Sequence, residues 1–327
     1  MWFEVLTGFA EESPEQVREN IIVDGGELIS RVSGRRFIPG ELETPSLAEL
    51  RRRAQSSKRN AGKTAVREVV ADVQELHRDE CNANSLFQVA SQFNLLEMVS
   101  PSVTPERGVG IYENDHTQGP ACAIAAGAGT IYRNYFANVN GKTGQSASNQ
   151  LDCLSDVGMA LGNSDRCLWQ MRNGYALPSE SGLIEIANRL RASTESDRDT
   201  LRGLLRIGIQ WSTQVTLDGC RHLVSQTYCS ALPVSYSRHP TSLWADFASL
   251  VLEASYEATF CAAIANVEKT GNNKLFLTLL GGGAFGNETD WIVRGIKRSI
   301  ELYGDQGLDV VIVSYGTSKR YIQELTT

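Results

Sequence analysis

The stretch that decides the fold is KLFLTLL at residues 274–280, followed by GGGAFGN at residues 281–287. The first part is an apolar run of strand length, and the second is a glycine-rich turn. Residues 289–303 have helical periodicity, and residues 308–315 form another apolar run, rich in Val and Ile. Strands that are apolar on both faces and alternate with helices are typical of a parallel or mixed sheet covered on both sides. The pattern therefore predicts an α/β fold.

The glycine-rich turn predicts a site for a phosphate or diphosphate. Glycine tolerates positive φ and lets backbone N–H groups come close to a ligand. A helix that follows, with Asn287 or Thr289 as its cap, points its positive end at the same place. The carboxyl end of a strand is also where open α/β sheets bind ligands. A ligand-free tight turn is the alternative, but four glycines within residues 281–286 exceed what a turn requires.

Alternating strands and helices are predicted from about residue 82 onward. A strand is expected at 87–93, and a helix of small residues at 120–136. A polar connection follows at 137–150. The later elements are expected as helices at 181–192 and 197–205, extended segments at 206–216 and 222–236, and a long amphipathic helix at 242–267.

Residues 1–80 are expected to form a helical N-terminal extension, packed on a main domain at 81–327. Ser13-Pro14 has the character of a helix start. The apolar spacing within 46–76 predicts a second helix, which carries the basic runs 51–53 and 58–59. Such charge runs are usually a solvated helix face, and less often a patch for an anionic partner.

Composition excludes several classes of protein. The chain has 327 residues and a net charge of −7, which does not suit wrapping of nucleic acid. No apolar run approaches the roughly 20 residues that span a bilayer, and no secretory signal is evident, so no membrane partner and a cytoplasmic location are expected. Seven scattered cysteines without a CxxC pair indicate buried free thiols in a reducing compartment and no structural zinc. No metal or other cofactor is expected.

The order of strand, Gly-Gly-Gly-Ala-Phe-Gly loop, helix and final strand resembles the last β-α-β unit of macrodomains. The resemblance implies a three-layer α/β/α fold with a mixed central sheet. It also implies that the loop binds the diphosphate of ADP-ribose and that Tyr315 lies against the adenine. The residues expected to contact ADP-ribose are Asn94, Gln118, Gly119, Gly281, Gly282, Gly283, Ala284, Phe285, Gly286, Asn287 and Tyr315.

The first half of the domain resembles the same family with two departures. Residues 88–94 stand for the signature strand end, and 117–120 with 121–129 stand for the loop and helix that follow. The insertion 95–116 is long, and the triple-glycine loop is missing there. The segments 91–94, 115–120 and 133–136 resemble a divergent branch that includes arginine-specific mono-ADP-ribosylhydrolases, among them bacterial effectors that reverse ubiquitin ADP-ribosylation. The implied partners are ADP-ribose and mono-ADP-ribosylated proteins.

Cleavage at the distal ribose is normally performed by carboxylates, because the transition state resembles an oxocarbenium ion. The insertion supplies Glu97, Glu106, Glu113 and Asp115. Asp115 is the first choice, to bind the ribose hydroxyls or orient water. Glu113 or Glu97 would assist the leaving guanidinium, which a carboxylate can bind bidentately.

Several alternatives remain open at this stage. His116 is a further candidate base, and these acids are otherwise loop solubilisers or helix caps. Glu253 and Glu257 share one helix face, and a solvated face is favoured for them over the pocket. The function predicted is removal of mono-ADP-ribose. Its rivals are a reader that binds ADP-ribose without cleaving it, an interaction protein with a decayed pocket, and an enzyme for small ADP-ribose derivatives.

Overall fold

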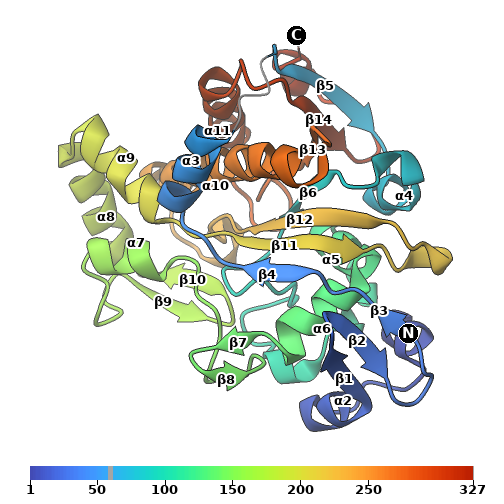
Figure 1. Ribbon diagram of the computed structural model, residues 1–327. Helices are drawn as coiled ribbons and strands as arrows, with labels where there is room; N and C mark the ends of the chain where they lie inside the picture. Colours follow the sequence, from blue (N-terminus) through green and yellow to red (C-terminus); the bar gives the residue numbers. More distant parts are fainter. Residues whose placement is uncertain (58–61, 327) are drawn as a thin grey trace.

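The computed structural model describes residues 1–57 and 62–326. At its centre is a mixed sheet of seven strands, which follow one another from β5 at the top of Figure 1 to β4 in its lower half. In spatial order the strands are β4 (Glu41–Glu43), β11 (Gly208–Gln214), β12 (Leu223–Cys229), β6 (Leu86–Ala90), β13 (Lys274–Leu277), β14 (Asp309–Ser314) and β5 (Ala65–Val70).

Five neighbouring strands of this sheet are parallel: β12, β6, β13, β14 and β5. Strand β11 runs antiparallel to both β12 and β4. The mixed sheet predicted from the sequence is therefore confirmed. Because parallel strands end on the same side, the carboxyl ends of β6, β13, β14 and β5 lie next to one another at one edge of the sheet.

Helices cover both faces of the sheet, which confirms the predicted three-layer arrangement (Figure 1). On one face α10 (Thr241–Thr270) is central, and α3 (Leu47–Ser56), α8 (Glu180–Ala192), α9 (Glu195–Leu204) and α11 (Thr289–Leu302) pack against it. The other face carries α4 (Val73–Arg78), α5 (Gln118–Ala125) and α6 (Gly127–Tyr135). Residues 120–136 are thus helical as expected, with a break at Ala126.

Helix α10 is the central element of the core. It follows Pro240 and ends at Gly271, whose φ of 77° terminates the helix. The expected amphipathic pattern is wrong, because the helix is buried on nearly all sides. Its length and apolar composition would also suffice to cross a membrane, contrary to the sequence expectation. Since 89% of its most apolar window is buried inside the protein, it has the character of a core helix.

The prediction of one helix over residues 46–76 is wrong. Helix α3 ends at Ser56, and β5 pairs with the whole length of β14. The apolar spacing of residues 66–70 fits both a helix and a strand. The segment forms a strand because β14 would otherwise be an unpaired edge of the sheet. The basic run is also not a solvated face throughout, because Arg51 is engaged in ion pairs; residues 58–59 lie outside the described residues.

Residues 1–80 are not a helical extension, since they supply β4 and β5 to the central sheet. Ahead of these strands lie α1 (Trp2–Thr7), α2 (Pro14–Asn20) and a small sheet of β1 (Ile21–Asp24), β2 (Glu27–Ser30) and β3 (Arg36–Phe37). This part packs with residues 96–112 and with α5–α6 in a second apolar cluster. Ser13 caps α2 as predicted. The domain boundary at about residue 80 stays a prediction.

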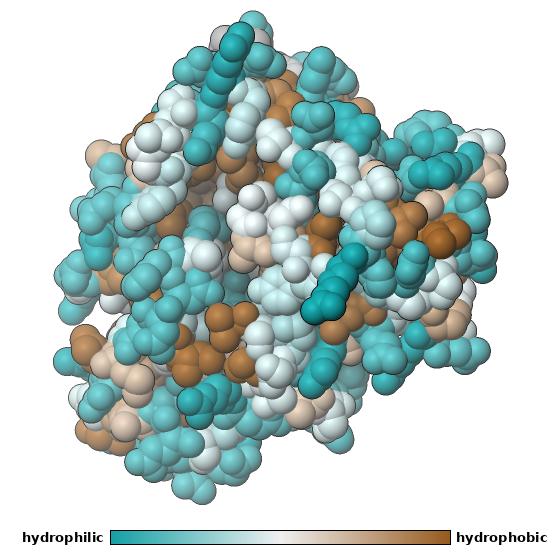
Figure 2. All heavy atoms as spheres, turned by 180° about the vertical axis from the view of Figure 1, so that it is seen from behind, coloured by the Kyte–Doolittle hydropathy of each residue, from teal (hydrophilic) through white to brown (hydrophobic). Residues whose placement is uncertain are grey.

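The remaining elements are short. They are α7 (Ser155–Ala160), α12 (Arg320–Gln323) and the hairpins β7–β8 (Asn138–Val139, Lys142–Thr143) and β9–β10 (Trp169–Arg172, Tyr175–Pro178). All seven cysteines are free, but Cys81 and Cys167 are exposed, so the expectation of buried thiols is wrong for these two. On the face shown in Figure 2, apolar residues form small separate groups rather than one broad patch.

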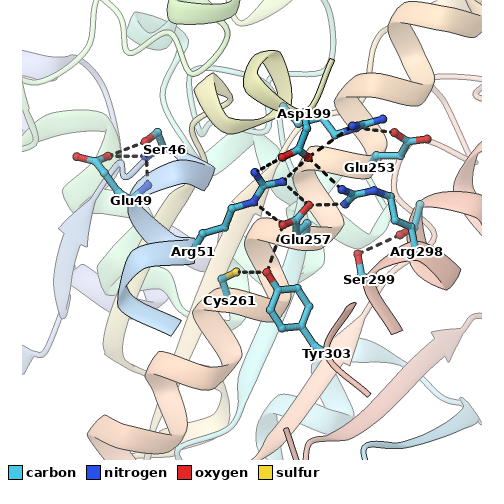
Figure 3. A network of polar contacts seen from close by, with 12 residues as sticks. Ser46, Glu49, Arg51, Asp199, Glu253, Glu257, Cys261, Arg298, Ser299 and Tyr303 are labelled. Atoms are coloured by element: carbon cyan, nitrogen blue, oxygen red, sulfur yellow. Dashed lines mark hydrogen bonds and ion pairs between the residues drawn. The ribbon is translucent and has the colours of Figure 1, made fainter. Parts of the chain in front are cut away.

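A network of ion pairs fastens α3, α9 and α11 to α10 (Figure 3). Glu257 is buried in α10 and accepts hydrogen bonds from Arg51 at 2.5 Å and from Arg298. Arg51 also binds Asp199, and Arg202 binds Glu253 at 2.7 Å. Glu253 and Glu257 are therefore neither a solvated face nor pocket residues: they bind arginines on the far side of the sheet from α5.

We expect Glu257→Gln to lower the free energy of unfolding by about 3 kcal/mol, because it removes the buried carboxylate that two partly buried guanidinium groups bind. Burial alone would raise the pKa of Glu257, but Arg51 and Arg298 hold it below its usual value. Because the folded-state pKa is lowered, this stabilisation is present above the unfolded pKa and is lost as pH falls through the folded one.

Urea unfolding followed by tryptophan fluorescence measures this effect. The matched control is Glu301→Gln, which removes an exposed glutamate on α11 with a long 4.0 Å contact to Lys297. Exposed pairs of this kind contribute little, so the control should unfold like the wild type. Equal unfolding midpoints for the two variants would contradict the role given to Glu257.

Candidate functional site

A cavity of about 910 Å³ lies along the carboxyl ends of the parallel strands. Its wall contains residues 71–74 after β5, 313–315 at the end of β14, 278–285 after β13 and 90–92 after β6. Because β5, β14, β13 and β6 are consecutive neighbours, these four segments line the cavity in that order. The strand order thus gives the cavity two distinct ends with the glycine loop between them.

The glycine loop forms the middle of this wall. Of the loop residues predicted to bind ADP-ribose, five line the cavity: Gly281, Gly282, Gly283, Ala284 and Phe285. Gly286 and Asn287 do not. The Asn287 side chain instead donates to the carbonyl oxygen of Leu232 at 2.8 Å, and its N–H donates to that of Gly281 at 2.9 Å. These two positions support the loop from behind.

Three successive N–H groups of the loop are without a protein acceptor. Among the described residues, no hydrogen bond uses the N–H of Gly283, Ala284 or Phe285. Helix α11 begins at Thr289 with Glu288 as its N-cap, so the predicted caps Asn287 and Thr289 are both wrong. Thr289 nevertheless lines the cavity. Free amides at a glycine turn before a helix are suited to bind an anion.

At the β5–β14 end, Tyr315 lines the cavity with 81% of its surface exposed, and its contact with adenine stays a prediction. Glu68 of β5 fixes the segment after β14, because it accepts hydrogen bonds from the Ser314 hydroxyl at 2.6 Å and from Lys319 N–H at 3.1 Å. Asp72 faces the same end and was missed, since residues 65–70 were read as helix. The sequence signal that could have identified Asp72 is an acidic residue directly after a strand.

At the β6 end, Glu97 is the most unusual group. Its side chain is buried, and its Oε1 atom has no hydrogen-bond partner within the described residues. Burial raises the pKa of Glu97 well above its usual value, Arg133 opposes this shift and Asp115 adds to it. The Tyr112 hydroxyl accepts the backbone N–H of Glu97 at 3.0 Å. A buried carboxyl without partners favours its neutral, protonated form.

The other predicted acids lie in different surroundings. Asp115 lines the cavity, and its Oδ1 accepts the Thr117 N–H at 2.9 Å. Glu113 also lines the cavity, and its Oε2 accepts the backbone N–H of Trp2 at 2.9 Å. Glu106 is not among the lining residues and binds Ala147 N–H at 2.8 Å. The structure therefore brings Glu97, Glu113 and Asp115 to one cavity, together with His116.

Two residues predicted to contact ADP-ribose use their side chains for hydrogen bonds within the protein. Asn94 does not line the cavity: it is fully buried, donates to Gln150 at 2.8 Å and accepts from Leu96 N–H. Gln118 lines the cavity, but its amide accepts from Ala90 N–H at 2.9 Å and donates to the carbonyl oxygen of Gln88 at 2.8 Å. The prediction of Asn94 as a ligand contact is thus not supported, because its side chain is buried against Gln150, Leu96 and Gly174.

Gly119 lines the cavity, and its lack of a side chain is required there. A Cβ atom at this position would lie 2.0 Å from the Ala90 carbonyl oxygen and 2.5 Å from Oε2 of Glu97. The close approach brings the amino terminus of α5 against the Glu97 carboxyl. This contact places Glu97 at the helix end that faces the cavity.

A buried cation close to Glu97 was missed by the sequence analysis. Arg133 is fully buried in α6, and its partners are the Leu95 carbonyl oxygen at 3.1 Å, the Tyr228 hydroxyl at 2.5 Å and the Thr130 hydroxyl at 3.1 Å. Its guanidinium lies 3.6 Å above the Tyr228 ring. All these partners are neutral, so its charge acts on Glu97. Nothing in the helix pattern distinguished this arginine.

The charges of the lining residues have a clear bias. Four carboxyl groups, those of Asp72, Glu97, Glu113 and Asp115, line the cavity, whereas Lys319 is the one lysine among its described lining residues. An anionic group bound in the middle therefore has to rely on backbone N–H groups rather than on basic side chains. The acids at the β6 end favour a cationic group there.

No model of a known protein family matches the chain, and no curated protein matches it. Among solved structures it is similar to a poly(ADP-ribose) glycohydrolase from Thermomonospora curvata, with 10% identity, 95% of each chain covered and a TM-score of 0.47. A structure of that protein bound to the inhibitor ADP-HPD matches at 12% identity, 95% coverage of each chain and a TM-score of 0.45.

The poly(ADP-ribose) glycohydrolase from Deinococcus radiodurans in complex with ADP-ribose is a further neighbour. It has 10% identity, covers 86% of this chain and 89% of its own, and gives a TM-score of 0.43. At such values these likenesses carry no argument about activity. The function proposed below rests on the cavity and its side chains.

The loop geometry predicts different outcomes for two glycine substitutions. Gly281 has φ of 76°, and a Cβ there would lie 2.4 Å from Cβ of Ala231. Gly281→Ala should therefore lower the free energy of unfolding by about 2 kcal/mol or more. Gly283→Ala is the matched control, because its Cβ would meet no atom within 4 Å. Thermal unfolding compares the two, and equal melting temperatures would contradict this description of the loop.

Proposed function

We propose that the protein is an ADP-ribosylhydrolase that removes mono-ADP-ribose from modified proteins, with arginine as the favoured linkage. One observation carries this proposal: within the described residues, the buried carboxyl of Glu97, whose Oε1 has no partner, shares a cavity with Asp115 and with the unpaired N–H groups of the glycine loop. Leaving a buried polar atom without a partner costs stability, so its retention suggests a function. A cavity of this size also suits a ligand as large as ADP-ribose.

The strand order suggests how ADP-ribose is bound. The diphosphate would accept hydrogen bonds from the N–H groups of Gly283, Ala284 and Phe285 in the middle of the cavity. The adenine would then lie at the β5–β14 end, where Tyr315 offers an aromatic face and Asp72 a hydrogen-bond acceptor. This orientation puts the distal ribose at the β6 end, beside Glu97 and Asp115.

The two acids suit the two proton transfers of glycosidic hydrolysis. Asp115 would accept a proton from water as the water oxygen bonds to the anomeric carbon. The bond from that carbon to the arginine nitrogen breaks, and its electron pair stays on the nitrogen. Neutral Glu97 would donate its proton to this leaving nitrogen. The products are ADP-ribose and the unmodified arginine, and the acids exchange the proton back through solvent.

The acid-rich end of the cavity favours arginine as the linked residue. A guanidinium carries positive charge, which Glu113 and Asp115 would attract. Trp2 lines the cavity as well and binds Glu113 through its backbone N–H, so its indole offers a face for a cation. A reader that only binds ADP-ribose has no need of a buried carboxyl whose Oε1 has no partner among the described residues, which is why hydrolysis is favoured over reading.

The direct test is release of free ADP-ribose from a protein that is mono-ADP-ribosylated on arginine. We expect Asp115→Ala to lower kcat by about 100-fold or more, the usual range for loss of a general base. ADP-ribose binding, measured by calorimetry, should persist because the glycine loop is untouched. Asp24→Ala is the matched control, since Asp24 is exposed in the distant β1–β2 hairpin.

Each outcome of this test has a distinct meaning. If the wild type binds ADP-ribose tightly but releases none from the modified protein, the protein is a reader and not a hydrolase. Release of ADP-ribose from serine- or glutamate-linked substrates but not from arginine-linked ones would contradict the proposal that arginine is the favoured linkage. Absence of ADP-ribose binding would refute the assignment of the cavity altogether.

The pH dependence of kcat tests the role of Glu97. Because burial raises the pKa of Glu97, its carboxyl keeps the proton needed by the leaving group to a higher pH than an ordinary glutamate does, and loses it as pH rises through that pKa. We therefore expect kcat to fall on the alkaline side. In Glu97→Gln the residual rate should be lower and should lack this alkaline decline. An unchanged alkaline decline in the variant would assign the proton donor to another group.

A further inference from the structure

The carboxylate of Glu11, far from the cavity acids in sequence, is enclosed by the backbone of residues 108–110. It accepts the N–H of Val109 at 2.9 Å and that of Gly110 at 2.6 Å. Gly108 has φ of 86°, and a Cβ at Gly108 or Gly110 would lie 2.5 or 2.7 Å from Oε2 of Glu11. The two glycines therefore allow the chain to wrap closely around this carboxylate.

Two further residues fasten the same contact. The Tyr135 hydroxyl of α6 donates to Oε1 of Glu11 at 2.6 Å. On the neighbouring helix α1, the Trp2 indole donates to the Val109 carbonyl oxygen at 3.2 Å, and the Trp2 backbone N–H donates to Glu113. Residues 2–11 thus hold both ends of the segment 109–113.

Residues 110–113 of this segment belong to the 3₁₀ helix η3 (Gly110–Asn114), which connects to all three acids at the β6 end of the cavity. Tyr112 accepts the N–H of Glu97 at 3.0 Å, and its own carbonyl oxygen accepts the N–H of Asp115 at 3.1 Å. Glu113 lies within η3 itself. A shift of η3 would therefore displace every acid at the β6 end.

We propose that Glu11 is a positioning residue for the reaction: by binding the amides of Val109 and Gly110 it holds η3, and through η3 it sets the places of Glu97, Glu113 and Asp115. This inference rests on the hydrolase proposed above. Glu11 does not line the cavity, so it acts on the acids and not on the substrate. The amino-terminal residues are accordingly a part of the catalytic apparatus.

The variant Glu11→Gln tests the proposal with little change of shape. Its amide group would point a donor at one of the three donors that Glu11 now accepts from, which are Val109 N–H, Gly110 N–H and the Tyr135 hydroxyl. We expect kcat to fall about 10- to 100-fold, because small displacements of catalytic groups have effects of that size. KM and ADP-ribose affinity should change less than about twofold, because the loop and the β5–β14 end keep their structure.

Two companions complete the experiment. Glu12→Gln makes the same chemical change at the next residue, which is exposed, and should keep wild-type kcat. Tyr135→Phe removes only one of the three donors and should lower kcat less than Glu11→Gln does. It also provides a second variant if Glu11→Gln does not fold. Hydrogen exchange of residues 109–115 should accelerate about tenfold in Glu11→Gln and stay unchanged in Glu12→Gln.

The results separate the positioning role from other causes. Unchanged kcat in Glu11→Gln and Tyr135→Phe, or a parallel loss of kcat and ADP-ribose affinity, would overturn the proposal. A wild-type protein that binds ADP-ribose without releasing it from any substrate would refute the hydrolase. In that case unaltered exchange in Glu11→Gln would also refute the fastening of η3 by Glu11, and faster exchange would establish it as a structural contact without a catalytic role.

Discussion

The parallel run of four neighbouring strands is the constraint on which the site depends. Strands β5, β14, β13 and β6 hydrogen-bond in one direction, so the segments that follow them must meet at one edge of the sheet. Those segments come from residues near 72, 92, 280 and 315 of the chain. The segments follow one another in space in the order of the strands. Four segments that are far apart in the sequence therefore line one cavity, and its two ends carry different residues.

Two kinds of polar group at that edge support the function proposed for the cavity. Backbone amides of the loop after β13 and the Oε1 atom of Glu97 are without partners in the described parts of the chain. The Glu97 atom costs free energy because it is buried without a partner, whereas the exposed amides of Gly283 and Ala284 are open to a ligand. A ligand that carries a diphosphate at the first place and a bond to be protonated at the second would satisfy both.

The amino-terminal residues are integrated into this arrangement at three places. Strand β5 borders the cavity and leads to Asp72, α3 is tied to α10 through Arg51 and Glu257, and Glu11 holds η3. These contacts join segments more than 90 positions apart in the sequence. A loss of stability in this part would therefore reach the cavity, although most of its residues lie outside the cavity wall.

The sequence by itself determined the buried strands, the glycine loop and the cavity position of Glu97, Glu113, Asp115 and Tyr315, because apolar runs, glycines and acids of a loop have local signatures. Only the tertiary structure decided that 65–70 is an edge strand, since its spacing fits a helix until β14 offers a partner. Packing likewise decided that Asn94 is buried, that Arg133 lies near Glu97, that Asp72 lines the cavity and that Glu11 binds the amides of Val109 and Gly110. The environment of a side chain depends on segments remote in sequence, and local pattern carries no information about them.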